Sequence, residues 1–552
     1  MGPGSIRIAI VGFGPRGLGA LEALVRQVGA ESAGVAVDLF DPVGWPAAGP
    51  NFSPDESPVC LLNLPVRTID LPPPTGGGPD DMSEWLGPED AEAFVPRARL
   101  GAYLNARFRD LQSRLPEGMT VTLHHRQITG AERAGRQWRL TDGSPDDGPY
   151  DHGPYDHVLL SLGQPETGDD KQTARWREHA GRHALAFMDA YPATALVRAA
   201  ETWAGRTVGI RGLGLSALDV VNILTLGLGG GFEDGRYVPS GREPQRIVPF
   251  SLDGHAPSPK PADAAVDARF EPLEEETGSL QAALRAALDG PPGTALKTVC
   301  DAIVMPARRI LEETGGDADA AAVGRWLAAE RESPGSQETR GTVDALRAGI
   351  AEAEGRVPPS VGYVIGQLWR KWQPLLREVY DGMDKPAATA QAMTGFDEGL
   401  KRYSYGAPVG TLRHLLALIE AGIVDPRAAD DPDIALTPDG WQLEADDRAV
   451  TANVMVDSVL PPAALEPVTD SLVTGLAKAS CVVPMADGLG ARCSVDGAAL
   501  GADGASVPGL WLAGRLTNGS TIAGDSIHDC FGIIPDRWAK AVVAGFGLDK
   551  AT

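Results

Sequence analysis

The chain has 552 residues, with 49 Lys and Arg against 74 Asp and Glu, which gives a formal net charge of −25. This length is too great for one compact core and predicts two or three domains. So acidic a surface repels phosphate backbones and anionic lipid, which disfavours nucleic acid and membranes as partners. It still allows a local basic pocket for an anionic ligand.

The five cysteines are scattered and form no Cys-x-x-Cys pair, which is typical of a reduced, intracellular protein rather than of a disulfide framework. No basic leader with an apolar core opens the chain, and no stretch of about 18 apolar residues occurs in it. We therefore expect a soluble, cytoplasmic protein.

The amino-terminal half alternates strands, Gly-rich turns and helices, which predicts an α/β fold. The predicted elements are, in chain order, a strand–turn–helix unit at 6–25, a strand at 35–42, loops at 43–80, a helix at 96–115, strands at 120–125 and 136–143, a loop at the tandem "GPYDHGPYDH" of 148–157, a buried strand at 157–166 and a second strand–turn–helix unit within 205–255.

The second half begins with a change of character. Ala, Glu, Arg and Leu in helical spacing dominate residues 261–400, which predicts a helical insert, and the spacing of Trp369 and Trp372 places both in its core. From about residue 405 the chain returns to strand and turn patterns, and it closes with a predicted helix at 535–546.

The first Gly-rich turn, "VGFGPRGLGAL", has the spacing Gly-x-Gly-x-x-Gly directly after an apolar strand. Gly12 allows the tight turn, Gly14 lets the backbone approach a pyrophosphate, and Gly17 lets the following helix pack closely. The helix N-terminus then favours the anion. Asp38 and Asp41 on the next strand can accept hydrogen bonds from ribose hydroxyls, and Asp41 at its end is better placed. The motif predicts a dinucleotide site.

The second turn, "GIRGLGLSALDVV", has Gly212 and Gly214 in the same places, with Ser216 where the third glycine would stand. Serine is small enough for close packing and can donate to phosphate. The next predicted strand, 246–252, is followed by Asp253 rather than by an arginine, the residue that often pairs with the 2′-phosphate of NADPH. A second nucleotide site is favoured, and a purely structural turn is the alternative.

These turns, together with the segments "LLSLG" and "LWLAGR", resemble flavoprotein monooxygenases that bind two dinucleotides. More narrowly, the chain resembles the FAD/NAD(P)-binding group that contains bacterial urate hydroxylase and nitrosuccinate synthase, the aspartate N-oxygenating enzyme. The segments that carry this resemblance are "LLNLPVRTIDL", "PRARLGAYL", "LGLSALDVV", "PSGREP", "LLALIEAGIVD" and "GDSIHDCFG". It covers most of the chain and is weakest over residues 261–390.

The resemblance implies FAD and NADPH as cofactors, with NADH as the alternative to NADPH. It implies that the adenosine half of FAD is held by Gly12, Gly14, Gly17 and Asp41. It also implies that Asn63 lies near the flavin and that Gly163 ends a strand beside it. Many related flavoproteins bind the ribityl chain with a Gly-Asp pair, whereas this chain has Gly514 and Arg515 there, and Asp525 is the candidate substitute.

The implied fold is α/β, a two-dinucleotide-binding (Rossmann-like) flavoprotein with a helical insert. We divide the chain into the first part of an FAD-binding domain (1–200), the core of an NAD(P)-binding domain (201–260), the helical insert (261–400) and the completion of both nucleotide-binding domains (401–552).

The predicted activity is that of an FAD-dependent, NAD(P)H-consuming biosynthetic monooxygenase that uses O2. Its expected reaction is N-oxygenation of the amine of a small amino-acid-like substrate through a flavin hydroperoxide. The alternatives are carbon hydroxylation of a nitrogenous ring, a flavoprotein oxidase or reductase without oxygen insertion, and a non-catalytic nucleotide-binding module. No metal site is predicted, because the neighbours His528, Asp529 and Cys530 cannot all face one ion.

An anionic substrate requires arginine side chains that can bind it. The candidates are Arg67, Arg97, Arg242 and Arg402, although any one such arginine is more often part of a surface ion pair. Arg242 is our first choice, because Pro and Gly fix its loop "PSGREP", and Asn63 is the second predicted catalytic residue.

Overall fold

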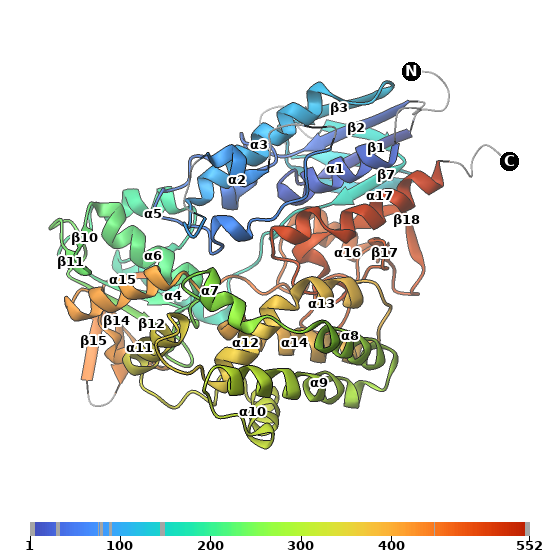
Figure 1. Cartoon of the computed structure of the whole chain (residues 1–552). Coiled ribbons are helices and arrows are strands. Elements are labelled where there is room, and N and C mark those ends of the chain that lie inside the picture. The colour runs from blue at the N-terminus through green and yellow to red at the C-terminus, as the bar shows by residue number, and fades with distance from the viewer. Residues whose placement is uncertain are drawn as a thin grey trace.

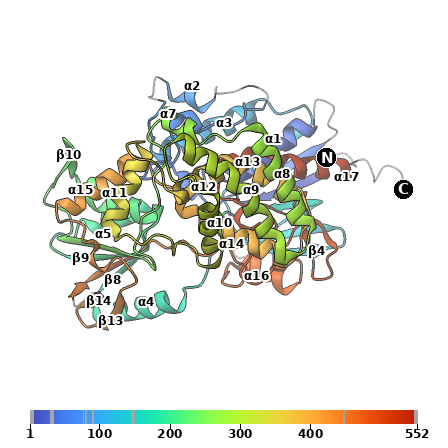
Figure 2. The same ribbon diagram turned by 60° about the horizontal axis from the view of Figure 1, so that its bottom comes forward.

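The computed structural model describes residues 6–28, 34–75, 77, 81–87, 91–143, 150–445 and 448–546. Two α/β domains lie side by side, and a layer of helices packs against both of them (Figures 1 and 2). The amino-terminal strands lie beside the carboxyl-terminal helix α17 in Figure 1, so the first domain is built from both ends of the chain.

The first domain is centred on a sheet of order β17-β18-β7-β1-β2-β3, in which only β17 is antiparallel to its neighbour. The strands are β1 (Ile6–Val11), β2 (Val35–Phe40), β3 (Met119–His124), β7 (His157–Leu160), β17 (Ala498–Leu500) and β18 (Ser506–Leu512). One face is covered by α1 (Pro15–Val28), α3 (Arg97–Ser113) and α17 (Ile533–Gly545), and α2 (Met82–Leu86) packs against α3.

The other face of this sheet is covered by α16 (Ser471–Lys478) and by a small antiparallel sheet. Its strands are β4 (Ile128–Ala134), β5 (Gln137–Asp142) and β6 (Tyr150–Tyr155). The prediction of a loop at 148–157 is therefore wrong for the residues that the structure describes there. Tyr150 to Tyr155 pair with β5, and Tyr155 is buried with Trp138 in the core, which explains why the segment forms a strand.

The second domain has an all-parallel sheet of order β12-β9-β16-β8. Its strands are β8 (Ala186–Asp189), β9 (Thr207–Arg211), β12 (Arg246–Phe250) and β16 (Val454–Asp457). β8 precedes residue 201, where we place the start of this domain. The sheet is accompanied by α4 (Lys171–His183), α5 (Ala193–Ala200), α6 (Leu215–Thr225), α15 (Val409–Glu420), the hairpin of β10 (Gly231–Glu233) and β11 (Arg236–Val238), and the antiparallel strands β13 (Asp433–Thr437), β14 (Gly440–Ala445) and β15 (Arg448–Ala452).

The segment between β12 and β13 is helical up to α15. Its helices are α7 (Ala264–Asp267), α8 (Glu274–Asp289), α9 (Pro292–Glu313), α10 (Ala320–Glu332), α11 (Thr342–Ala353), α12 (Val361–Lys371), α13 (Gln373–Tyr380) and α14 (Ala387–Ser404). Trp369 and Trp372 are 1% and 2% exposed in its core, as their spacing predicts. The helical insert of the expected fold class is thus confirmed. In the described part of the chain, no helix has the length and apolar character needed to cross a membrane.

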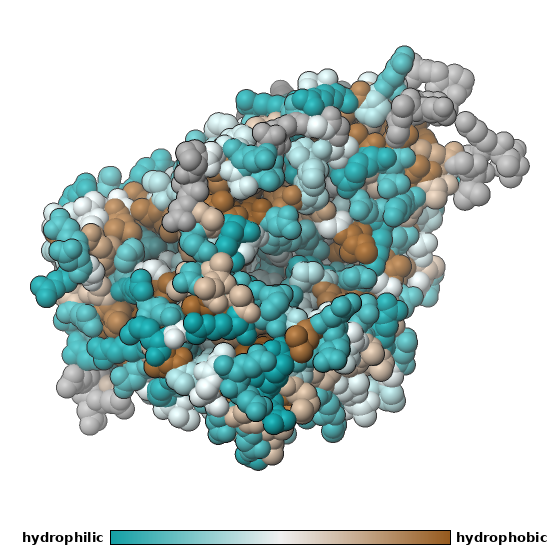
Figure 3. All heavy atoms as spheres, viewed as in Figure 1, coloured by the Kyte–Doolittle hydropathy of each residue, from teal (hydrophilic) through white to brown (hydrophobic). Residues whose placement is uncertain are grey.

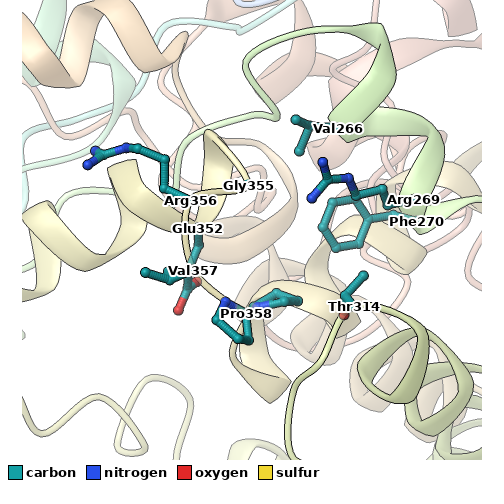
Figure 4. Close-up of a pocket in the computed structure, with 10 residues that line it drawn as sticks. Val266, Arg269, Phe270, Thr314, Glu352, Gly355, Arg356, Val357 and Pro358 are labelled. Carbon is teal, nitrogen blue, oxygen red and sulfur yellow. The ribbon is translucent and has the colours of Figure 1, made fainter.

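A cavity of about 190 Å³ opens among the helices of the insert (Figure 4). Its walls include Phe270, Thr314 and the carboxyl group of Glu352, which accepts a hydrogen bond from Ser360 Oγ at 3.2 Å. Glu352 is 8% exposed, and burial raises its pKa to about 7. A buried carboxylate therefore lies in the insert without a neighbouring cation strong enough to restore its usual pKa.

Replacing Glu352 by Gln should stabilise the insert above pH 7. The folded protein holds the Glu352 proton up to about pH 7, whereas the unfolded chain releases it near pH 4.5, so the free energy of unfolding of the native protein falls as pH rises through this window. E352Q removes that loss, which amounts to at most about 3 kcal/mol. Urea unfolding at pH 5 and pH 8 measures the difference in the free energy of unfolding between E352Q and the native protein. Glu312→Gln, at an exposed position of α9, is the control. An equal effect at both pH values would contradict the assignment.

Candidate functional site

The first Gly-rich turn joins β1 to α1 at the carboxyl edge of the first sheet. Gly12 has φ 86°, and a Cβ there would lie 2.5 Å from the carbonyl oxygen of Ser161. A Cβ on Gly17 would lie 2.7 Å from the carbonyl oxygen of Gly12. Gly14 differs, because a Cβ there would meet only Gly49 at an ordinary 3.6 Å. Protein packing therefore requires glycine at two of the three positions, whereas the third has room for a Cβ against Gly49.

Asp41, directly after β2, binds this turn from the side. One carboxylate oxygen accepts the backbone N–H of Phe13 at 2.8 Å and the other that of Val43 at 2.9 Å. Burial raises the Asp41 pKa against these two hydrogen bonds. Each oxygen keeps a second lone pair, so the side chain can orient the turn and still accept from a ribose hydroxyl. Asp38 instead binds Arg7, His124 and Tyr155.

The carboxyl edge is completed from β7 and β18. Gly163 has φ 71°, and no atom lies within 4 Å of where its Cβ would be. Gly514 has φ 83°, and its Cβ would lie 2.6 Å from Nε of Arg16. Because the strands are parallel, Gly12, Asp41, Gly163 and Gly514 follow strand ends on one edge.

The next two predicted residues have partners within the protein. Arg515 donates to the side chain of Gln164 at 2.5 Å and to the carbonyl oxygen of Pro461 at 2.7 Å. Asp525 accepts from Nζ of Lys401, on α14, at 2.9 Å. Asp525 thus connects this domain to the insert, and Arg515 connects it to the chain between the two domains.

The second Gly-rich turn repeats the first at the edge of the second sheet. Gly212 has φ 102°, and its Cβ would lie 2.7 Å from Oγ of Ser458. Gly214 is the N-cap of α6, no side chain caps the helix, and no atom lies within 4 Å of where its Cβ would be. Ser216 is buried in the first turn of α6, which contains no acidic residue. The N-terminus of α6 is therefore open to an anion.

Both sheets place their Gly-rich turn at a topological switch point. In the first sheet, β2 and β7 lie on opposite sides of β1, and in the second sheet, β12 and β16 lie on opposite sides of β9. Ligands of open α/β sheets bind in the crevice at such a point. The structure thus supplies two cradles for nucleotide phosphates, and the residues present fit FAD and NAD(P)H.

The strand that would reach the adenosine of the second nucleotide is β12. Ser251 follows it and donates to Asp253 at 3.0 Å, and Asp253 forms an ion pair with Arg402. An arginine therefore lies beside this strand end, brought from α14, although none follows the strand in sequence.

A polar cluster connects the two domains. Asp219, on α6, forms an ion pair with Arg97 at 2.5 Å and accepts from the Tyr191 hydroxyl at 2.5 Å. Arg97 also donates to Tyr191 at 3.1 Å and to the carbonyl oxygen of Leu61 at 3.2 Å. Arg97 is one of the four candidate arginines for an anionic substrate, and the structure gives it a carboxylate partner within the protein. The sequence carries no signal for this pairing of α3 with α6.

Of the remaining candidates, Asn63 and Arg67 lie in the first domain, and Arg242 lies in the second. Asn63 is half-buried in the loop that precedes Arg67. Arg67 pairs with Glu92 at 3.0 Å and with Asp267 at 3.3 Å. Arg242 is exposed in the loop after β11, and the β10–β11 hairpin lies at the outer edge of the second domain (Figure 1). The catalytic roles of Asn63 and Arg242 stay predictions.

Cations gather where the first domain meets the insert. Asp267, at the end of α7, pairs with Arg67, Arg370 and Lys371. Lys260 is 7% exposed, donates to the carbonyl oxygen of Gly406 at 2.8 Å, and has its pKa lowered to about 7 by burial and by Arg370. Figure 3 shows this face of the molecule hollowed near its centre, between the first domain and the insert.

The two cradles and their parallel sheets define a flavoprotein fold that binds two dinucleotides. Residues 9–165 match the family model described as FAD-NAD(P)-binding. The chain is also similar in fold to ornithine hydroxylase from Pseudomonas aeruginosa, with 10% identity, a TM-score of 0.51 and coverage of 98% of this chain and 99% of the other.

Two curated relatives are more similar in sequence. A nitrosuccinic acid synthase of Aspergillus oryzae is 30% identical over 279 residues, which span 45% of this chain and 41% of that protein. An L-aspartate N-monooxygenase of Streptomyces cremeus is 24% identical over 581 residues, 85% of this chain and 82% of the other. The first relative is thus matched over less than half its length. The resemblance to the group that contains nitrosuccinate synthase is confirmed.

Gly214→Ala tests the second cradle without disturbing the fold. The added methyl group meets no protein atom within 4 Å, so the melting temperature should stay unchanged, while the methyl group would block the close approach of a pyrophosphate. We expect NADPH binding at least about tenfold weaker and an unchanged FAD content. Gly475→Ala on α16, where a Cβ also meets nothing, is the control. Unweakened NADPH binding would show that the turn is only structural.

Proposed function

We propose that the protein is an FAD-dependent, NAD(P)H-consuming monooxygenase that oxygenates the amine nitrogen of a small amino-acid-like substrate. The observation that carries the proposal is the pair of open cradles, one on each sheet, beside a helical insert that contacts both domains. When bound, NAD(P)H supplies the hydride and FAD the redox and oxygen chemistry. The likeness to L-aspartate N-monooxygenase over 85% of the chain supports the nitrogen as target.

The residues of this chain position and enclose the reactants. Asp41 orients the first turn, and the Arg97–Asp219 ion pair holds the first helix of the second cradle against the first domain. The insert reaches the first domain through the Lys401–Asp525 ion pair. An amine can be oxygenated only when it carries a lone pair, and a nearby cation would disfavour its protonated form. Arg67, Arg370 and Lys371, which surround Asp267 at the junction with the insert, are the candidates for that effect.

The test is an anaerobic experiment on the FAD-loaded protein. NADPH or NADH should abolish the visible flavin absorption, and air should then restore it, with formation of an N-oxygenated product when L-aspartate or another small amine is present. G214A, which should keep FAD, is the control and should not be reduced. A quantitative yield of hydrogen peroxide with every amine would favour the oxidase alternative. A flavin that neither nucleotide reduces would overturn the proposal.

A further inference from the structure

Three arginines are buried in the described part of the chain, and one of them lacks an acidic partner. Arg16 is 8% exposed and pairs with Asp529 at 2.7 Å, and Arg107 is 1% exposed and pairs with Glu22 at 2.6 Å. Arg377 is 9% exposed, and no carboxylate of the described residues lies within 4.0 Å of its guanidinium. A buried charge without a counter-charge is costly, so its retention requires a reason.

Most of the hydrogen-bond donors of Arg377 also have no partner among the described residues. Its guanidinium has five N–H donors, and its one side-chain bond within the described chain runs from Nη1 to Oε1 of Gln373 at 3.4 Å. Gln373 in turn donates to Asp397 at 3.1 Å, so its amide stands between the guanidinium and that carboxylate. The remaining donors of Arg377 are available to a ligand.

The groups around Arg377 do not neutralise it. Burial raises the pKa of Asp381 to about 8 and that of Cys530 to about 11, and it raises the pKa of Tyr405 well above its usual value. Burial lowers the pKa of His528, and Arg377 lowers it further. Asp381 is the carboxyl group whose pKa the guanidinium lowers, but burial raises that pKa more strongly and no ion pair joins the two side chains among the described residues.

Arg377 lies where the insert meets the first domain. The helix that carries it, α13, docks on the chain that follows β18, because the Tyr380 hydroxyl donates to Gly519 O at 2.7 Å and Ile522 N–H donates to Asp381 at 2.9 Å. The same chain segment binds the first Gly-rich turn through Arg16, which donates to Gly524 O at 2.6 Å. Arg377 therefore lies on the helix that docks beside the first nucleotide cradle, within electrostatic reach of His528 and Cys530 in that segment.

We propose that Arg377 binds a carboxylate of the substrate and so makes the enzyme select small amines that carry one. This inference rests on the proposed function and deepens it. A guanidinium accepts a carboxylate in a bidentate pair, which fixes the orientation of the substrate as well as its affinity. The substrate carboxylate would also supply the negative charge that Arg377 lacks among its neighbours in the described chain. An amine without a carboxylate would leave Arg377 unpaired and would bind weakly.

Binding measurements on the FAD-loaded protein test the proposal without turnover. Succinate, a dicarboxylate without an amine, and L-aspartate are titrated by calorimetry into the native protein, Arg377→Met and Arg377→Lys. We expect Arg377→Met to weaken the binding of succinate and of L-aspartate by about 30-fold or more. Arg377→Lys should weaken binding less, because lysine keeps the positive charge but lacks the two parallel N–H donors of a guanidinium. FAD content and the rate of flavin reduction by NADPH should not change. Arg325→Met on α10, where the arginine is exposed, is the matched control.

The outcomes separate this inference from the proposed function. Unchanged binding by Arg377→Met, loss of FAD from both variants, or no binding of either probe by the native protein would overturn the carboxylate site. If Arg377→Met fails to fold, its melting temperature shows this, and Arg377→Lys carries the test. Oxygenation of amines by Arg377→Met at the native KM would overturn the inference and leave the function standing. Carboxylate binding that depends on Arg377, without oxygenation of any amine, would overturn the function instead.

Discussion

A buried ion pair between the two ends of the chain determines how the first domain is built. Arg16, within the first Gly-rich turn, reaches Asp529 at 2.7 Å, and the two side chains are 10% and 3% exposed. Breaking such a pair on one side leaves a buried charge, which typically costs about 3–5 kcal/mol. Gly514 has no side chain because Arg16 occupies that space. Residues 514–546 are thereby fixed on the first turn, and the described segments between them and that turn are nested between the two ends.

A second buried cluster fixes the other nucleotide cradle relative to the first. Arg97 opens α3 of the first domain, Asp219 lies in α6 of the second, and the Tyr191 hydroxyl bonds to both. α6 begins at Gly214, so the cluster holds the second Gly-rich turn itself. A hydride can pass between two nucleotides only when their sites keep a defined orientation, and directional, charge-assisted bonds maintain one better than apolar contacts do.

The sequence predicted what depends on neighbours along the chain. Glycines at Gly12 and Gly212 were recognisable because a tight turn after a strand requires positive φ, and both have it. Contacts between distant segments left no such pattern. Asp525 was a candidate for the ribityl chain, but its Lys401 partner comes from a helix 124 residues away. The Pro and Gly residues around Arg242 could be read from the sequence, whereas the exposure of its side chain could not.

The burial of Arg377 also could not be predicted from the sequence around it. In "QPLLREVY" an arginine in the last turn of a short helix is typical of a solvated residue that balances the helix dipole. Its burial follows from the docking of α13 on residues 519–522, which lie more than a hundred positions later. Only the packed structure distinguishes it from the many arginines whose charges are paired at the surface.

The net charge of −25 also says little about the local charge where the first domain meets the insert. Around Asp267 the structure gathers Arg67, Arg370 and Lys371, and Arg377 adds an unpaired cation at the other side of the same junction. Field lines from an acidic surface are weakened by solvent and salt, whereas charges in a desolvated cleft act at short range and at low effective dielectric. A small anion beside these side chains would therefore meet a local charge opposite in sign to the net charge of the chain. The net charge is thus no guide to the charge at a buried junction between domains.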